Sequence, residues 1–162
     1  MSILSAHKSS PPRISYWPPV SIIALTVQLV LVAAGALQGG IAMITDPESP
    51  MGISLAHLEA TPFDSYLWPG LFLLGIALAA IITIPGLLLR WEWNWAWRIE
   101  SAIGYEWPWI SIVAIGLLLF TLEVIGLLFG HLPFVVHMLL LALSLNMIGL
   151  ALTDSARRYL AS

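Results

Sequence analysis

Four long apolar segments, separated by shorter polar stretches, dominate the chain. They cover residues 20–44, 67–89, 109–130 and 133–152. A helix rises 1.5 Å per residue, so about 20 apolar residues cross the hydrocarbon core of a bilayer. The segments do not alternate as the strands of a membrane barrel do, and a helix pairs its own backbone groups in lipid. The pattern therefore predicts an all-α integral membrane four-helix bundle, one domain over residues 1–162.

The composition narrows the class further. Hydrophobic residues make up 59% of the chain and charged residues 9%, and the mean hydropathy is +0.92. Soluble domains are nearer half apolar and one quarter charged. The 6 basic residues are too few for the basic face that nucleic acid requires. Because the chain has no cysteine, disulfides, thiol catalysis and Cys-ligated metals are also excluded.

The basic residues indicate how the chain is threaded. All of them fall in segments that lie on one side of the predicted bundle: Lys8, Arg13, Arg90, Arg98, Arg157 and Arg158. The predicted outer loop, residues 45–66, has neither lysine nor arginine. By the positive-inside rule, we expect both termini to be cytoplasmic, an N-in/C-in topology.

The N-terminal region has a second interpretation. Its basic start, the apolar run 20–32 and the small residues Ala34 to Ala36 are also typical of a cleaved secretory signal. The apolar run continues to Ile44, however, and is longer than the apolar part of such a signal. We therefore expect the first span to be retained.

The outer loop carries signals of local structure. Asp46 followed by Pro47 favours a turn, and Thr61, which precedes a proline, indicates a helix start. Between them, residues 53–58 predict a short amphipathic helix on the outer membrane surface. We therefore expect this loop to be structured.

The cytoplasmic loop, residues 90–108, and the start of the third span are rich in tryptophan. The six indoles belong to Trp91, Trp93, Trp95, Trp97, Trp107 and Trp109. Tryptophan is typical of the interfacial belt of membrane proteins, where the ring is buried and the N–H stays wet. It is also found at docking surfaces, here for a partner subunit, a quinone or a pigment. The sequence does not separate the two interpretations.

Residues 39–75 contain a pattern made up of Gly39-Gly40, Met43, Asp46-Pro47, Gly52, Leu58, Thr61-Pro62-Phe63, Tyr66 and Pro69-Gly70, followed by an acidic residue in the third span. With this pattern the chain resembles a family of small uncharacterised bacterial four-span membrane proteins. The chain departs from the family where four residues, 48–51, separate Pro47 from Gly52, so its turn is expected to differ. The resemblance implies four spans in a bacterial cytoplasmic (inner) membrane and brings no activity with it.

Glu123 is the only acidic residue within the four predicted spans. An ionisable side chain in a span is costly and by default indicates a functional site. Gly116, Gly126 and Gly130 lie on the same face of its helix, and small residues let a second helix approach closely. We therefore expect Glu123 to face the inside of the bundle.

Other polar residues form two layers when depth is counted at 1.5 Å per residue. Gln28 and Asn146 share an inner layer, where we expect amide hydrogen bonds that specify packing. Glu123, His137 and Gln38 share an outer layer, the predicted intramembrane polar site. A protonated Glu123 bonded to Gln38 would be structural, whereas a pair with His137 is suited to relaying protons or binding a cation. Both alternatives stay open.

Two cofactor hypotheses can be compared with the spacing of the candidate ligands. His131 and His137 are six residues apart, so they would point to different sides of one helix and would not bind one haem together. The acidic outer loop has the residue types of a cation site but also those of an ordinary solvated loop. We predict no cofactor and no metal site, and leave open a bound lipid, quinone or pigment.

Three classes of function remain. We favour a non-catalytic integral membrane subunit or accessory protein of a larger membrane protein assembly, whose partners are membrane lipids and other integral membrane subunits. The alternative is a small proton- or cation-coupled transporter or channel that uses Glu123 and His137. The third is an outer-leaflet membrane enzyme using Asp46, His57 and Asp64, although no known nucleophile, phosphate-loop or zinc motif is present.

Overall fold

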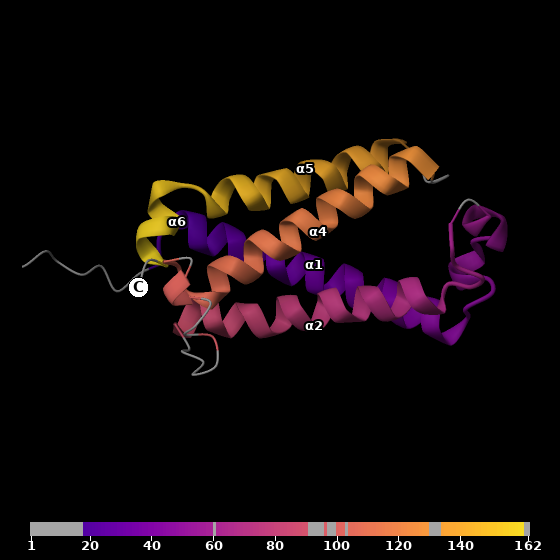
Figure 1. Ribbon diagram of the computed structural model, residues 1–162, viewed down its shortest axis with the longest axis horizontal. Helices are drawn as coiled ribbons and strands as arrows, with labels where there is room; N and C mark the ends of the chain where they lie inside the picture. The colour runs from indigo at the N-terminus through magenta and orange to yellow at the C-terminus, as the bar shows by residue number, and fades with distance from the viewer. Residues whose placement is uncertain are drawn as a thin grey trace, which may run out of the picture.

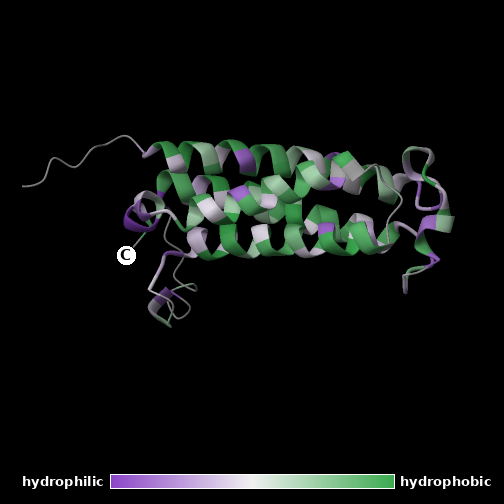
Figure 2. Ribbon diagram, turned by 90° about the horizontal axis from the view of Figure 1, so that it is seen from above, coloured by the Kyte–Doolittle hydropathy of each residue, from purple (hydrophilic) through white to green (hydrophobic). Residues whose placement is uncertain are grey.

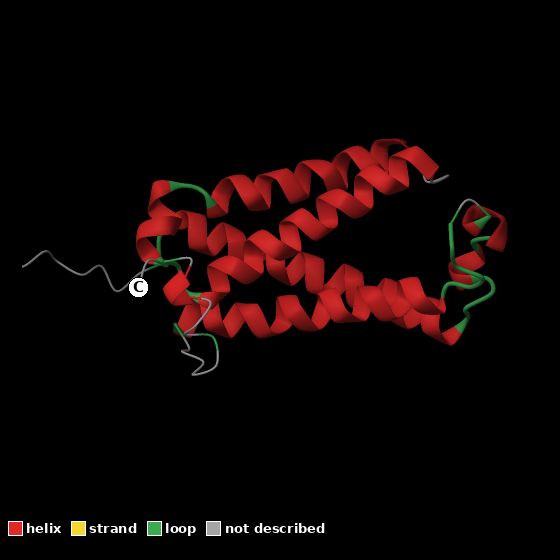
Figure 3. Cartoon of the chain, viewed as in Figure 1, coloured by secondary structure: helices red, strands yellow, loops and turns green. Residues whose placement is uncertain are grey.

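The structure, a computed structural model, describes residues 18–59, 61–90, 96, 100–102, 104–129 and 134–160. Over these residues the chain is helical and contains no strand (Figure 3). The helices are α1 (Val20–Thr45), η1 (Pro50–Gly52), η2 (Leu55–Leu58), α2 (Leu67–Leu89), α4 (Trp107–Phe129), α5 (Phe134–Ala151) and α6 (Asp154–Tyr159). The four longest helices agree with the predicted apolar segments to within two residues at each end, which confirms the all-α helical fold.

The four long helices pack as two hairpin pairs. The most extensive contacts join α1 with α2 and α4 with α5, and smaller contacts join α2 with α4 and α1 with α5. The helices thus form an up-down ring. The pair α4 and α5 diverges from the pair α1 and α2 toward the end that carries the loop between α1 and α2 (Figure 1). The core lies where the two pairs meet.

Small residues let α1 and α2 approach closely. A Cβ atom added to Gly70 would lie 2.8 Å from the Cβ of Met43, and one added to Gly40 would lie 3.0 Å from the carbonyl oxygen of Gly70. Side chains larger than hydrogen therefore have no room at this crossing. The same α1 continues without interruption through Ala34 to Ala36, where the signal-peptide interpretation places a cleavage site.

The outside of the bundle is apolar. Exposed large side chains lie on every long helix, among them Leu31, Leu78, Leu117 and Leu139. Hydrophobic residues cover the helices, and hydrophilic residues gather mainly at the two ends (Figure 2). Helices α1, α2 and α4 are long and apolar enough to cross a membrane, and α5 contributes a shorter apolar helix. Because soluble monomers rarely expose large apolar patches, this surface indicates a membrane protein.

The two ends of the bundle differ in charge. The end of α2 and the short helix α6 lie together, and the guanidinium of Arg90 sits 5.7 Å from the centre of the Tyr159 ring. Arg157 and Arg158 belong to the same α6. The described basic residues thus share one end, as the predicted topology requires, and the acidic loop between α1 and α2 lies at the other.

The loop between α1 and α2 is ordered by local hydrogen bonds. The hydroxyl of Tyr66 donates to the carbonyl of Ser54 at 3.0 Å, and its N–H donates to the carbonyl of Pro47 at 2.9 Å. Burial raises the pKa of Tyr66 above its usual value of 10.0, so the hydroxyl stays a donor. The expected structure of this loop is confirmed in outline.

Two details predicted for this loop are wrong. The segment 53–58 forms only the 3-10 helix η2, and the positive φ angles of Met51 and Gly52 separate it from the residues before it. No helix begins at Thr61, because its hydroxyl donates back to the carbonyl of Leu58 and closes η2, whereas α2 begins at Leu67 as the apolar segment predicts.

Candidate functional site

Glu123 of α4 and His137 of α5 meet inside the bundle. The Oε2 atom of Glu123 lies 2.8 Å from Nδ1 of His137, within hydrogen-bonding distance. The side chain of Glu123 is 16% exposed and that of His137 is 5% exposed, so both are largely buried. The expected contact between these two residues is therefore present in the structure.

Glycines on α4 provide the space for this contact. A Cβ atom added to Gly126 would lie 2.7 Å from Cε1 of His137, so the imidazole packs directly against the glycine backbone. Ten residues earlier, a Cβ on Gly116 would lie 2.7 Å from Cγ1 of Ile148. The glycine face of α4 is thus turned toward α5. Gly130, the third predicted member of this face, lies outside the described residues.

A cavity of about 320 Å³ lies beside the pair, at the small end of the range typical of ligand sites. All four long helices contribute to its wall, through Leu31, Val32, Gly35, Ala36, Leu73, Leu119, Glu123, Leu140 and Leu143. Glu123 is the one ionisable residue in this wall, and every other lining residue is apolar. The structure therefore exposes a carboxyl group to an otherwise hydrocarbon-lined space.

The imidazole of His137 also has an unused atom. Its Nε2 is buried and has no hydrogen-bond partner among the described residues. A buried polar atom without a partner carries a desolvation cost, and such atoms are rare in folded proteins. The pair therefore retains hydrogen-bonding capacity beyond the contact between its two members.

Gln38 does not join this site, contrary to the prediction. It is exposed and makes no hydrogen bond within the part of the chain that the structure describes. Ala36 and Gly40, each two residues away, are buried, and two residues correspond to roughly 200° around a helix. The side chain of Gln38 therefore lies on a different face of α1 from these buried residues.

Gln28 and Asn146, the predicted inner layer, are hydrogen bonded across the bundle. Nε2 of Gln28 donates to Oδ1 of Asn146 at 2.6 Å and links α1 to α5. Oε1 of Gln28 is buried without a partner among the described residues. This pair is made only of neutral groups, so it contributes to packing specificity rather than to proton chemistry.

Two further contacts between helices were not predicted from the sequence. The hydroxyls of Thr83 in α2 and Ser111 in α4 lie 2.6 Å apart, and Thr83 is fully buried. The hydroxyls of Ser21 in α1 and Ser155 in α6 lie 2.9 Å apart. Isolated serine and threonine residues in apolar runs were the available signal. Neither pair is titratable in the ordinary pH range, so neither extends the candidate site.

The tryptophan-rich segment is described only in part. Trp91, Trp93, Trp95 and Trp97 lie outside the described residues. The ring of Trp107 packs so closely on Gly86 of α2 that a Cβ there would overlap it. Nε1 of Trp109 donates to the carbonyl of Ala151 at 2.9 Å, and Tyr105 stacks on the Trp109 ring with centroids 4.4 Å apart. These two indoles are half-buried and join helices of the same chain, so part of each ring is engaged within the bundle.

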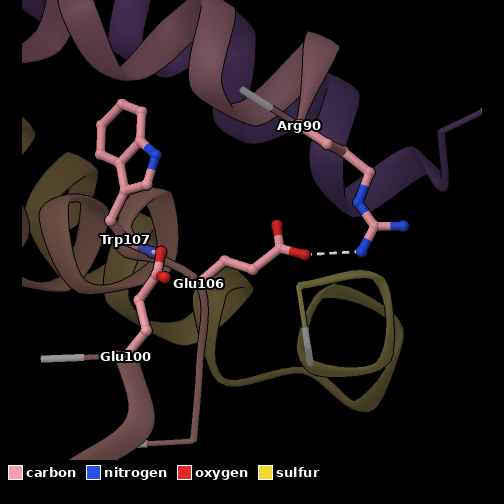
Figure 4. Close-up of polar contacts among 4 residues, drawn as sticks. All are labelled: Arg90, Glu100, Glu106 and Trp107. Atoms are coloured by element: carbon pink, nitrogen blue, oxygen red, sulfur yellow. Dashed lines mark hydrogen bonds and ion pairs between the residues drawn. The ribbon is translucent and has the colours of Figure 1, made fainter. Parts of the chain in front are cut away.

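Next to these tryptophans, polar contacts hold together the end of α2 and the start of α4 (Figure 4). A guanidinium nitrogen of Arg90 lies 2.5 Å from Oε1 of Glu106, which ties the end of α2 to the segment before α4. Oε1 of Glu100 accepts a hydrogen bond of 2.8 Å from the backbone N–H of Trp107. A carboxylate at a helix N-terminus also interacts favourably with the helix dipole. The role of this cluster is therefore to fix the start of α4.

No group of three or more potential His, Asp or Glu metal ligands comes together in the described ranges. In the outer loop, Oδ1 of Asp46 accepts a hydrogen bond of 3.1 Å from the N–H of Ser49 and completes a turn. His131, one of the histidines considered for haem, lies outside the described residues. The candidate site is consequently the Glu123–His137 pair and the cavity beside it.

Comparison with protein-family models, curated proteins and solved structures gives no match for this chain. The resemblance of residues 39–75 to small bacterial four-span membrane proteins thus stays a prediction from the residues themselves. Any conclusion about function has to come from the site.

Proposed function

We propose that this chain is a small multi-pass protein of a bacterial cytoplasmic membrane that couples the movement of a cation to that of a proton through Glu123 and His137. One observation carries the proposal. The pair lines, through Glu123, a cavity to whose wall all four long helices contribute. A buried ionisable pair beside a cavity is a common arrangement in ion and proton pathways.

The pair is suited to hold or release one proton. With two protons it is neutral overall, as carboxylic acid and imidazole or as carboxylate and imidazolium. With one proton it is a carboxylate beside a neutral imidazole, and its net charge is −1. An isolated charge is costly in an apolar interior, so a cation that enters the cavity compensates for the proton that leaves. This exchange is the basis of the proposed coupling.

Two structural observations lead us to rank the coupling hypothesis above the accessory-subunit hypothesis. The accessory-subunit hypothesis depended in part on a tryptophan docking surface, and Trp107 and Trp109 are engaged within the chain. The coupling hypothesis needed Glu123 and His137 to come together, and they lie 2.8 Å apart. The proposed orientation, with cytoplasmic termini, is supported by the described arginines at one end of the bundle.

Reconstitution in liposomes tests the coupling. With a pH-sensitive dye trapped inside, we expect added monovalent cations from a panel of inorganic and organic ions to change the internal pH. Glu123→Gln, which keeps the shape but removes the titration, should abolish this response. Glu48→Gln is the matched control, because it makes the same change at an exposed loop residue. An unchanged response in Glu123→Gln, or no response to any cation in the unmodified protein, would contradict the proposal.

A second candidate function, a subunit of a larger membrane assembly, is favoured by a groove between α2 and α4. The groove encloses about 480 Å³ and is lined by Leu71, Phe72, Gly75, Ile76, Ala79, Ser111, Ala114, Ile115 and Leu118. Its small members, such as Gly75 and Ala79, are spaced by four residues, a spacing that lets membrane helices approach closely. A Cβ on Gly75 would meet nothing within 4 Å, so this position is open to a partner helix.

Purification from the native membrane tests this second function. A partner helix in the groove should be lost in Gly75→Leu, because a leucine side chain would occupy its path. Gly149→Leu is the control, since Gly149 of α5 is likewise exposed and has no neighbour within 4 Å. Recovery of the same stoichiometric partner with both variants would exclude the groove as its binding surface.

A further inference from the structure

We infer that the ligand of the cavity is a lipophilic monovalent organic cation, which binds against Glu123 and releases one proton from the Glu123–His137 pair. This inference rests on the proposed function and names the class of ion that it moves. It starts from the contrast between the single carboxyl group and the eight apolar residues of the cavity wall. A ligand that fits both must carry a positive charge inside an apolar shell.

Charge complementarity points to a cation. Among the elements packed around Glu123, α1 and α2 contain no ionisable residue, α4 contains only Glu123 itself, and α5 contains only His137. The only other ionisable group in these four helices is therefore an imidazole, which can give up its proton. No fixed positive charge on them competes with a bound cation.

The apolar wall is poorly suited to binding small inorganic ions. Hard metal cations are held by several oxygen ligands at short distance. The cavity wall provides one carboxyl group, and no other side chain in it carries an oxygen atom. A bare metal ion would therefore lose most of its water without replacement, whereas an organic cation brings its own hydrocarbon surface into the cavity.

The position of the cavity suits a ligand that arrives from lipid. Leu31 and Gly35 of α1 and Leu140 of α5 belong to its wall and are exposed on the outside of the bundle. The α1 to α5 contact is less extensive than those within the hairpin pairs. The cavity is thus bordered by lipid-facing side chains, where lipophilic cations concentrate.

The exchange balances in charge and in protons. In the inferred exchange, the pair starts with two protons and is neutral. The cation takes its place beside the Glu123 carboxylate, the imidazole remains neutral with its Nδ1 proton directed at Oε2, and one proton passes to the solution. The occupied site is again neutral overall, and no covalent bond between heavy atoms changes.

Binding of tetraphenylphosphonium to the full chain in detergent tests the inference. We expect calorimetry in buffers of different ionisation enthalpy to give one proton released per cation bound, with an affinity that rises by up to about tenfold per pH unit. Triphenylphosphine oxide, a neutral probe of similar apolar groups, should bind much more weakly. Equal binding of both probes, or an affinity independent of pH, would overturn the inference.

Variants locate the site. Glu123→Gln should weaken the binding of tetraphenylphosphonium by about tenfold or more, as expected when a charged partner is lost, and Glu48→Gln should leave it unchanged. If Glu123→Gln does not fold, the pH dependence of the unmodified protein decides. Liposomes that couple protons to an inorganic cation while tetraphenylphosphonium fails to bind would refute this inference alone. Binding with proton release but without transport would refute the proposed transport and leave the site in place.

Discussion

Gly126→Ala gives the most direct test of how the Glu123–His137 pair is held. The added methyl carbon would lie 2.7 Å from Cε1 of His137, where ordinary contacts begin at 3.4 Å. The imidazole must therefore move away from Gly126 by about 0.7 Å, because the backbone of α4 at Gly126 is fixed by its helical hydrogen bonds. A shift of this size along the bond would lengthen the 2.8 Å contact with Glu123 beyond hydrogen-bonding distance.

The energetic cost can be bracketed. Hydrogen bonds between membrane helices contribute about 0.6 kcal/mol on average and up to about 1.7 kcal/mol. Replacing glycine by alanine in a helix interior gains up to about 1 kcal/mol from helix propensity and partly masks this loss. Gly149→Ala provides the correction, because a Cβ on Gly149 meets nothing within 4 Å. We expect Gly126→Ala to be less stable than Gly149→Ala by about 1 kcal/mol.

Reversible unfolding in mixed micelles, followed by circular dichroism, measures this difference. The same two variants should also differ in the number of protons released when tetraphenylphosphonium binds. This number should be reduced in Gly126→Ala and unchanged in Gly149→Ala. If both variants unfold with the same free energy and release protons equally, Gly126 does not position the imidazole and the geometry argued for the site is wrong.

Three further predictions concern packing and topology. Asn146→Leu leaves the Gln28 amide unpaired and should cost about 1 kcal/mol in unfolding free energy, whereas the double change to leucine at both positions should recover most of that loss. Thr83→Val keeps the volume but removes the contact with Ser111, and thermal unfolding should show a loss of about 0.6 to 1.7 kcal/mol. Ser54→Cys gives the chain its only cysteine, at an exposed loop position. An impermeant maleimide should label this cysteine from outside intact cells. Labelling only after lysis would contradict the predicted topology.

The long helices were predictable because each apolar run has about the length needed to cross the hydrocarbon core of a bilayer. A run of apolar residues ends where polar groups must reach water, so the first polar residues after each run indicate its boundary within two residues. The loop between α1 and α2 was less predictable, since its conformation depends on single backbone angles at Met51 and Gly52. Proline and glycine signals indicate turns there, but they do not specify which turn follows which.

The candidate site was predictable where depth and helix face were considered together. The glycine face of α4 indicated the direction of Glu123, and depth then indicated His137. Gln38 was assigned to the site from its estimated depth alone. It lies two residues along the helix from buried positions of α1, so its side chain is on a different face and outside the site. An isolated threonine was the available signal at Thr83, but it does not specify a contact between helices. Threonine in apolar helices commonly bonds within its own helix, as the Thr83 hydroxyl does by donating to the carbonyl of Ala79.

Each contact between neighbouring long helices has a different chemical basis, and this separates packing from proton chemistry. Closely approaching glycine backbones join α1 with α2, hydroxyls join α2 with α4, and amides join α1 with α5. The contact of α4 with α5 alone includes a titratable pair in the described part of these helices. A change in its protonation therefore acts directly on one side of the bundle, because the groups named in the other three contacts are not titratable in the ordinary pH range. Because Glu123 also lines the cavity, the proposed function predicts that the same change alters the charge that a ligand meets there.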